Sequence, residues 1–545
     1  MHDLDRNMTQ RSPSSFDQPW WKGAVIYQIY PRSYQDTTGN GVGDLSGITS
    51  RLEHVASLGV DGIWISPFFT SPMKDFGYDV ADYCNIDPVF GSLADFDRLL
   101  DEAHRLGLKV IIDQVYAHTS DAHAWFAESR QDRSNDRSDW YVWRDPKPDG
   151  SPPNNWQAVF GGPSWTWDAR RQQYYMHNFL PSQPQLNLHN ASVQGALLDV
   201  MRFWLDRGVD GFRLDALNFA LFDPEFRDNP PKQRRPDVIS RPFDLQEHIY
   251  NQSHPDLPAF LRRLRSLMDE YGDIFSVAEV PGTDPLEEMR AYTAGEAHLH
   301  SAYNFDFLYA GNLTAEIFAR SQRNWLGSAG EGWPSWAFSN HDAPRCISRW
   351  LSEADINVRA KLTNALLYCM RGNPILYQGE ELGLPQAVIA FEDLQDPEAI
   401  ANWPRTLGRD GARTPMPWNG DSANCGFSSS KPWLPIGQGH GERAVAAQEA
   451  QADSVLNFTR MLARVRSESP ALRIGDIRID VAEGDILVFR RSIESETVEC
   501  VFNLGPAEQD SSVSLAEPED VLFAVGMQGS SLGGLPPFSC RVSRI

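Results

Sequence analysis

Arg213 and Asp215 lie two positions apart in a largely apolar segment, GVDGFRLDALN at residues 208–218. Side chains of a strand alternate between its two faces, so a strand here would point both charged groups to the same side. A guanidinium beside a carboxylate lowers the carboxylate's pKa and keeps it charged, as a nucleophile requires. A structural ion pair at the end of a strand would show the same pattern, and the pair alone does not decide between the two readings.

A recurring pattern of helix, glycine and strand surrounds this pair. Five segments run from an amphipathic helix through a glycine, which suits the left-handed turn at a helix C-terminus, into an apolar strand. They are HVASLGVDGIWIS, EAHRLGLKVIIDQV, FWLDRGVDGFRLDA, LMDEYGDIFSVAEV and YCMRGNPILYQGEE. Strands are also expected at residues 24–31, 302–309 and 335–341, which brings the total to eight. We therefore predict an α/β fold, a (β/α)8 TIM barrel with its parallel sheet covered by helices.

An open, doubly wound sheet is the alternative architecture. It would need a GxGxxG phosphate loop after its first strand, and that motif is missing there. The helix expected over residues 92–108 shows the pattern well, because its apolar residues fall on one face and Ser92 with Asp95 resembles a capping box.

The pattern also indicates how the chain divides into domains. Residues 1–118 and 191–467 form the barrel, domain A, with a long insertion at about 384–453 after strand 8. Residues 119–190, after strand 3, lack helical periodicity, are rich in tryptophan and form an inserted subdomain, domain B. From residue 468 to 545 the apolar period changes to two (GDILVFRR, TVECVFNLG, DVLFAVG), which predicts a C-terminal antiparallel β domain, domain C.

Composition excludes several classes of function. The 49 basic and 73 acidic residues give a formal charge of −24, which argues against a nucleic-acid or anionic-membrane partner. The first residues carry no basic, apolar pattern of a secretory signal, and no apolar run is long enough to cross a membrane. The six cysteines are scattered, so we expect reduced thiols in a cytoplasmic protein, a monomer or homodimer without an organic cofactor.

Charged and polar residues gather where the predicted strands end, and in TIM barrels that end carries the chemistry. Four of these stretches together resemble the signature regions of the α-amylase superfamily, glycoside hydrolase family 13. They are DQVYAH (residues 113–118), GFRLDA (211–216), AEV (278–280) and FSNHD (338–342). Each is weak alone, but their order and spacing make a match that spans nearly the whole chain.

The resemblance implies three catalytic carboxylates, namely Asp215 as nucleophile, Glu279 as general acid/base, and Asp342 as the acid that holds the sugar. Cleavage with retention needs a nucleophilic and a protonatable carboxylate about 5 to 5.5 Å apart. Arg213 would keep Asp215 ionised. Glu279 stands between Ala278 and Val280, and we expect this apolar surround to raise its pKa.

The resemblance also implies a set of sugar-binding residues. Similar α-glucosidases use residues matching Asp75 and Tyr78 to grip the terminal glucose, which makes attack exo. The stretch QPQLN (residues 183–187) resembles the QPDLN element of the oligo-1,6-glucosidase group, and the small Ala216 matches relatives that prefer α-1,4 bonds. The full set is Asp75, Tyr78, His118, Phe160, Phe179, Gln183, Arg213, Ala216, His341 and Arg413.

The first loop, DTTGNGVGD at residues 36–44, resembles the metal loop of this group. The resemblance implies a calcium or magnesium ion bound by side chains of Asp36, Asn40 and Asp44 and by the carbonyl of Val42, all of them hard oxygen ligands. Thr38 stands where the pattern commonly has an amide, and a glycine-rich turn without metal is the alternative.

We therefore expect a retaining exo-α-glucosidase that cleaves α-1,4-linked glucose from short oligosaccharides such as maltose and also transfers glucose to an alcohol or sugar acceptor. An isomerase of the trehalose or isomaltulose synthase type is the alternative on the same barrel. A non-catalytic barrel, as in amino-acid transporter heavy chains, is disfavoured because those proteins lose the acids and carry a membrane helix, whereas Asp215, Glu279 and Asp342 are all present.

Overall fold

The computed structural model describes residues 18–233, 241–282, 284–323, 332–406, 408–509, 518–527 and 534–545. The first seventeen residues, where the sequence showed no signal pattern, lie outside the described residues. None of the helices in the described ranges has the length and apolar character needed to cross a bilayer.

Eight parallel strands close into a barrel, in the order β1-β13-β12-β11-β10-β9-β5-β2. They are β1 (Ile26–Ile29), β2 (Gly62–Ile65), β5 (Lys109–Val115), β9 (Gly211–Asp215), β10 (Phe275–Val280), β11 (Ser301–Asn304), β12 (Trp333–Ala337) and β13 (Asn373–Tyr377). The predicted TIM barrel is confirmed. Two strands end earlier than predicted, β11 at Asn304 and β12 at Ala337, so the polar and aromatic residues that follow lie on loops.

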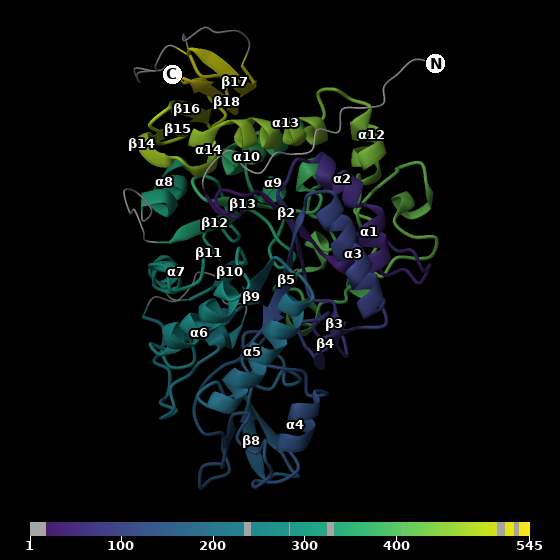
Figure 1. Ribbon diagram of the computed structural model, residues 1–545, viewed down its shortest axis with the longest axis vertical. Coiled ribbons are helices and arrows are strands. Elements are labelled where there is room, and N and C mark those ends of the chain that lie inside the picture. Colours follow the sequence, from purple (N-terminus) through teal and green to yellow (C-terminus); the bar gives the residue numbers. More distant parts are fainter. Residues whose placement is uncertain are drawn as a thin grey trace.

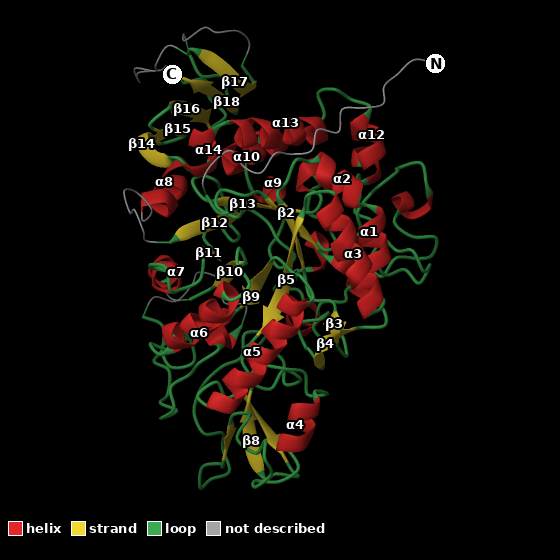
Figure 2. Ribbon diagram, viewed as in Figure 1, coloured by secondary structure: helices red, strands yellow, loops and turns green. Residues whose placement is uncertain are grey.

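Helices surround the barrel on its outer side (Figure 2). They are α1 (Leu45–Ser50), α2 (Leu52–Ser57), α3 (Leu93–Arg105), α5 (Ala191–Asp206), α6 (Leu257–Asp269), α7 (Pro285–Thr293), α8 (Ala315–Arg323), α10 (Ile356–Cys369) and α13 (Val455–Glu468). Shorter helices are α9 (Cys346–Arg349), α11 (Pro397–Asn402), α12 (Val445–Glu449) and α14 (Pro470–Ile474).

Helix α3 shows how sequence sets these elements. Ser92 and Asp95 form the predicted capping box, which satisfies free N–H groups at the first turn. Phe96 and Leu99 are fully buried against the barrel. The helix ends before Gly107, whose φ of 76° is costly for a residue with a side chain. The chain then turns directly into β5, which ends next to the pocket.

The segment after β5 folds as a small layer of its own. It holds α4 (Ala124–Ser129) and a three-stranded sheet of β6 (Trp143–Arg144), β7 (Trp165–Asp168) and β8 (Gln173–Met176). Trp156 and Trp165 are 0% and 3% exposed, so these two tryptophans belong to a local core of this segment. A separate hairpin, β3 (Phe69–Thr70) and β4 (Asp82–Ile86), flanks the loop with Asp75.

The chain ends in a five-stranded antiparallel sheet of order β14-β15-β16-β18-β17. Its strands are β14 (Asp476–Glu483), β15 (Ile486–Ile493), β16 (Glu496–Asn503), β17 (Asp520–Val525) and β18 (Ser539–Arg544). This sheet and the segment with β8 lie at opposite ends of the long axis (Figure 1). The C-terminal sheet therefore lies away from the strand ends that face the segment with β8.

Candidate active site

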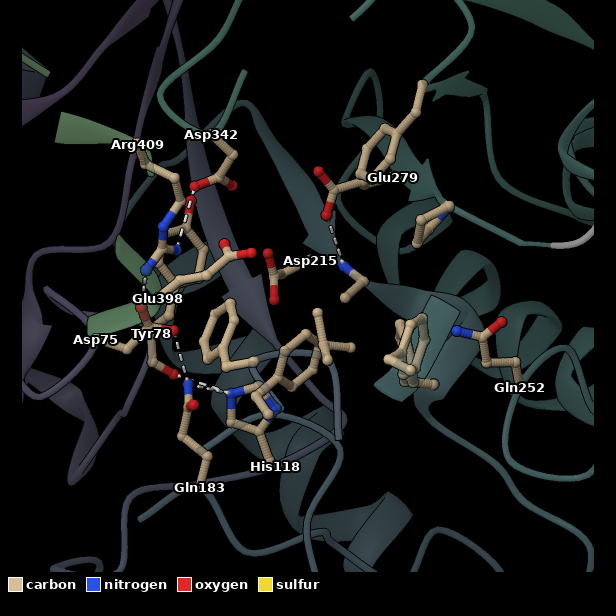
Figure 3. Close-up of a pocket in the computed structure, with 18 of the residues that line it drawn as sticks. Asp75, Tyr78, His118, Gln183, Asp215, Gln252, Glu279, Asp342, Glu398 and Arg409 are labelled. Atoms are coloured by element: carbon tan, nitrogen blue, oxygen red, sulfur yellow. Dashed lines mark hydrogen bonds and ion pairs between the residues drawn. The ribbon is translucent and has the colours of Figure 1, made fainter. Parts of the chain in front are cut away.

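The ends of the barrel strands surround a pocket of about 310 Å3. That volume is at the small end of the range for ligand pockets, about 300–1,000 Å3. The predicted residues that line it are Asp75, Tyr78, His118, Phe160, Phe179, Gln183, Asp215, Ala216, Glu279 and Asp342. Figure 3 shows the carboxylates of Asp342, Asp215 and Glu279 around the same space. Residues up to 267 positions apart thus meet because parallel strands end at one face of the barrel.

Arg213 and Asp215 face the same side of β9, as strand alternation predicts. Nη1 of Arg213 lies 2.6 Å from Oδ1 of Asp215 and 2.8 Å from Oδ1 of Asp113 on β5. Burial raises the pKa of Asp215 well above its ordinary value, Arg213 opposes this rise, and the acids Glu279 and Asp113 add to it. Desolvation of a fully buried carboxyl therefore acts against the ion pair, and the charged state of Asp215 that the sequence predicts stays a prediction.

Glu279 is surrounded by polar groups. The N–H of Ala216, a residue in the left-handed conformation (φ 39°, ψ 43°), donates to Oε2 of Glu279 over 3.0 Å. Oε1 accepts a hydrogen bond from the Tyr303 hydroxyl at 3.1 Å and lies 2.6 Å from Nη2 of Arg213. The prediction of an apolar surround for Glu279 is therefore wrong. The neighbours of Glu279 along β10 are apolar, but its side chain contacts polar groups from β9 and β11.

Asp342 follows β12 and is held by two arginines. Its Oδ1 lies 2.6 Å from Nη2 of Arg413 and 3.4 Å from Nη1 of Arg409. Burial acts in the opposite direction, but His341, Arg413 and Arg409 together hold the pKa of Asp342 well below its ordinary value. Asp342 is thus a fixed negative charge in the pocket at neutral pH.

Asp75 is anchored at both carboxylate oxygens. Arg409 donates to Oδ1 over 2.8 Å, and Gln183 donates to Oδ2 over 3.0 Å. Nε2 of Gln183 also lies 3.2 Å from Nε2 of His118. Because a carboxylate has about four lone-pair sites, Asp75 can still accept hydrogen bonds from a ligand's hydroxyl groups. This end of the pocket is therefore built to hold a polar ligand in one orientation.

Three predicted residues lie behind the pocket wall. Arg213, His341 and Arg413 are at most 1% exposed and are not among its lining residues. The ring of His341 stacks on Tyr78 with centroids 5.3 Å apart, and Nε of Arg413 donates to the carbonyl of His341 over 2.7 Å. These side chains support the residues in front of them. Their direct contact with a sugar stays a prediction.

The pocket also contains residues that the sequence did not single out. Arg409 lies four positions before Arg413 in the segment RDGARTPMPW, but the family resemblance points only to Arg413. Glu398, on α11, pairs with Arg241 at 3.2 Å, and Arg241 donates to the carbonyl of Val159 over 3.0 Å. No motif marks this pair. It joins three segments around the pocket that lie far apart in the sequence.

The predicted metal loop is occupied by its own hydrogen bonds. Asp36 accepts the N–H of Thr38 over 2.9 Å and those of two loop glycines over 2.8 Å each. Asn40 accepts the N–H of Val42 over 2.8 Å, and Asp44 caps α1. No group of three or more His, Cys, Asp or Glu in the described ranges could hold a metal ion. The predicted ligand set also uses the Asn40 side chain and the Val42 carbonyl, which are not among those residue types, so calcium or magnesium binding stays a prediction.

Comparison with known proteins gives a consistent result. The family model described as "Alpha amylase, catalytic domain" matches residues 28–475. A probable alpha-glucosidase of Rhizobium meliloti (strain 1021) is 54% identical over 508 residues, 92% of each chain. The solved structure of the alpha-glucosyl transfer enzyme XgtA is 50% identical with a TM-score of 0.90, covering 97% of this chain and 100% of that one. The trehalulose synthase MutB from Pseudomonas mesoacidophila MX-45 is 31% identical with a TM-score of 0.87, covering 97% and 99%.

Proposed function

This chain belongs to the α-amylase catalytic-domain family of glycoside hydrolases, and on that premise we propose that it is a retaining exo-α-glucosidase. It removes terminal α-1,4-linked glucose from short oligosaccharides such as maltose and also transfers that glucose to alcohols or sugars. The similarity to an alpha-glucosidase and to an alpha-glucosyl transfer enzyme supports both activities.

One observation carries the proposal. Nη1 of Arg213 lies 2.6 Å from Oδ1 of Asp215, and Nη2 lies 2.6 Å from Oε1 of Glu279. This one guanidinium keeps the two carboxylates close together. Retaining glycosidases have their two carboxyl groups about 5–5.5 Å apart, and inverting ones about 6.5–9.5 Å. The shared cation supports the shorter separation, and with it a covalent intermediate.

In the first step, the carboxylate of Asp215 attacks the anomeric carbon of the terminal glucose. The glycosidic C–O bond breaks as the new ester bond forms, and Glu279 gives its proton to the leaving oxygen. In the second step, water or an alcohol attacks the same carbon, its proton passes to Glu279, and the ester bond to Asp215 breaks. Arg213 is the main group that favours the charged form of Asp215.

The residues at the Asp75 end support exo attack on a terminal glucose. Asp75, Gln183 and His118 form one hydrogen-bonded set there, which suits the hydroxyl groups of a non-reducing end. At the opposite side, Pro281, Phe305 and Tyr309 line the pocket, and Tyr309 is 55% exposed. This half-open, largely apolar side would hold the leaving sugar and then the acceptor.

The test is chromatography of the products formed from maltose with excess glycerol, with Asp215→Asn as the blank. We expect free glucose and a glucosylated glycerol from the wild type, and neither from the variant. An unchanged product pattern in the variant would show that Asp215 is not the nucleophile.

A sugar isomerase is the second candidate, because the chain is also similar to a trehalulose synthase. The same experiment separates the two, with sucrose as an added substrate. A disaccharide isomer of the substrate with little free glucose would assign the protein to the isomerases.

A further inference from the structure

Tyr303 faces the interior of the barrel beside Glu279, but it is not one of the pocket-lining residues. It lies on β11 directly opposite Glu279 in the register of β10 and β11, so the two side chains point to the same side of the sheet. Its side chain is fully buried. A polar group at such a position needs partners, and its partners are groups of the active site.

The hydroxyl of Tyr303 links Arg213 to Glu279. It accepts two N–H groups of Arg213, from Nε over 3.2 Å and from Nη2 over 3.0 Å. It donates to Oε1 of Glu279 over 3.1 Å. A phenol has one proton to donate, and with Arg213 on its acceptor side that proton is directed to Glu279. Burial raises the pKa of Tyr303 well above its ordinary value, so the hydroxyl keeps this proton.

The carboxylate of Glu279 is thereby held at both oxygens. Ala216 donates its N–H to Oε2, and Tyr303 donates to Oε1. Arg213 also approaches Oε1, at 2.6 Å. Coulombic attraction to a cation depends weakly on angle, whereas a hydrogen bond requires alignment. The two donated hydrogen bonds therefore fix the plane of the carboxylate.

We propose that Tyr303 is a positioning residue, whose hydroxyl, directed by Arg213, orients the Glu279 carboxyl for proton transfer with the glycosidic oxygen and the acceptor. This rests on the proposed function. A displacement of about 1 Å in a reacting group can cost on the order of 100-fold in rate. Because Tyr303 does not line the pocket, its loss affects kcat far more than KM.

The test compares Tyr303→Phe with Tyr27→Phe. The first removes only the hydroxyl. The second is a matched control, because Tyr27 is also fully buried on a barrel strand and donates to a buried carboxylate, Oε1 of Glu381 at 2.7 Å, outside the pocket. Any general cost of losing a buried hydroxyl is common to both variants.

For Tyr303→Phe we expect kcat on maltose to fall by about 10- to 100-fold, with KM within about threefold of the wild type. The loss in kcat/KM should be several-fold smaller for 4-nitrophenyl α-glucoside, whose leaving group needs little protonation. The alkaline limb of kcat/KM against pH should move to higher pH, because a donor to the charged carboxylate is gone. Tyr27→Phe should show none of these changes.

The groups that face Glu279 and enter this pH profile come from several elements. They are Arg213 and Asp215 on β9, Asp113 on β5, Tyr303 on β11, and Tyr309 on the loop after β11. None of them is altered in Tyr303→Phe except Tyr303 itself, so a shift of the alkaline limb reports the lost hydroxyl.

If Tyr303→Phe matched Tyr27→Phe in rates and pH profile, the positioning role would be wrong while the proposed function stood. If the wild type released no glucose from either substrate, the proposed function itself would fail. If Tyr303→Phe did not fold, Tyr303→3-fluorotyrosine would serve, because its more acidic hydroxyl is a stronger donor and should move the alkaline limb to lower pH. An unmoved limb there would overturn the inference.

Discussion

Replacing Arg409 by methionine tests how the pocket is held together. Nη2 of Arg409 lies 2.8 Å from Oδ1 of Asp75 and 2.8 Å from Oδ1 of Asp396. Nη1 lies 3.4 Å from Oδ1 of Asp342. The side chains of Arg409, Asp75 and Asp396 are 9%, 5% and 0% exposed. Arg409→Met keeps an apolar stem of similar length but removes the guanidinium charge that these buried acids share.

The structure sets the size of the effect. Removing one partner of a buried ion pair costs about 3–5 kcal/mol of stability, because the other charge is left without compensation. Burial already raises the pKa of Asp75, and Arg409 is the main opposing charge, so the pKa rises further in the variant. A neutral Asp75 loses its charge-assisted hydrogen bond to a sugar, about 1.5–3 kcal/mol. We expect kcat/KM for maltose to fall by about 10- to 150-fold.

The assay is maltose kinetics as a function of pH, together with the urea midpoint. With a raised pKa, Asp75 becomes charged only at higher pH. Activity of Arg409→Met should therefore recover partly as pH increases. Arg409→Lys, which keeps the charge without the planar fork, should lose less. In a double-mutant cycle, Asp75→Asn should do less damage in the Arg409→Met background than in the wild type. Strictly additive losses would refute the argument that these two residues act through one ion pair.

Three further results are expected. Ala216→Val should lower the ratio of maltose to isomaltose hydrolysis by about 10-fold, because a methyl-scale change in a pocket alters discrimination by about 1–3 kcal/mol. An unchanged ratio would show that Ala216 does not select the linkage. Burial lowers the pKa of His440 to about 4 in the folded protein, against about 6.5 in the unfolded chain. The unfolded chain therefore binds an extra proton as pH falls from about 6.5 to 4, and the folded protein loses stability over that range. Between pH 7 and pH 5 the wild type should lose about 2 kcal/mol more of its free energy of unfolding than His440→Gln, and urea midpoints that stay parallel would contradict this. If the loop at residues 36–44 binds metal, calcium added to chelator-treated protein should raise the melting temperature, because a ligand at 100 times its Kd stabilises the folded state by about 2.7 kcal/mol. A melting temperature that rises with neither calcium nor magnesium would contradict that site.

The sequence by itself determined the architecture and the positions of the three acids. Helix and strand periods, the capping box at Ser92 and the glycines between helices and strands are local features, and they predicted all eight barrel strands. A parallel barrel then leaves one place for residues at strand ends to meet. Together with the resemblance of their motifs to the α-amylase superfamily, this predicts that Asp215, Glu279 and Asp342 share one pocket, and all three line it.

Only the tertiary structure decided the environment of each charge. Arg409 and Asp75 are 334 positions apart in the chain, and no local pattern joins them. The neighbours of Glu279 in sequence are apolar, yet its neighbours in space are Arg213, Tyr303 and a backbone N–H. A pKa depends on burial and on charges within a few ångströms. Those are set by which strands lie side by side, so the chemistry of the site follows from the folded barrel rather than from its motifs.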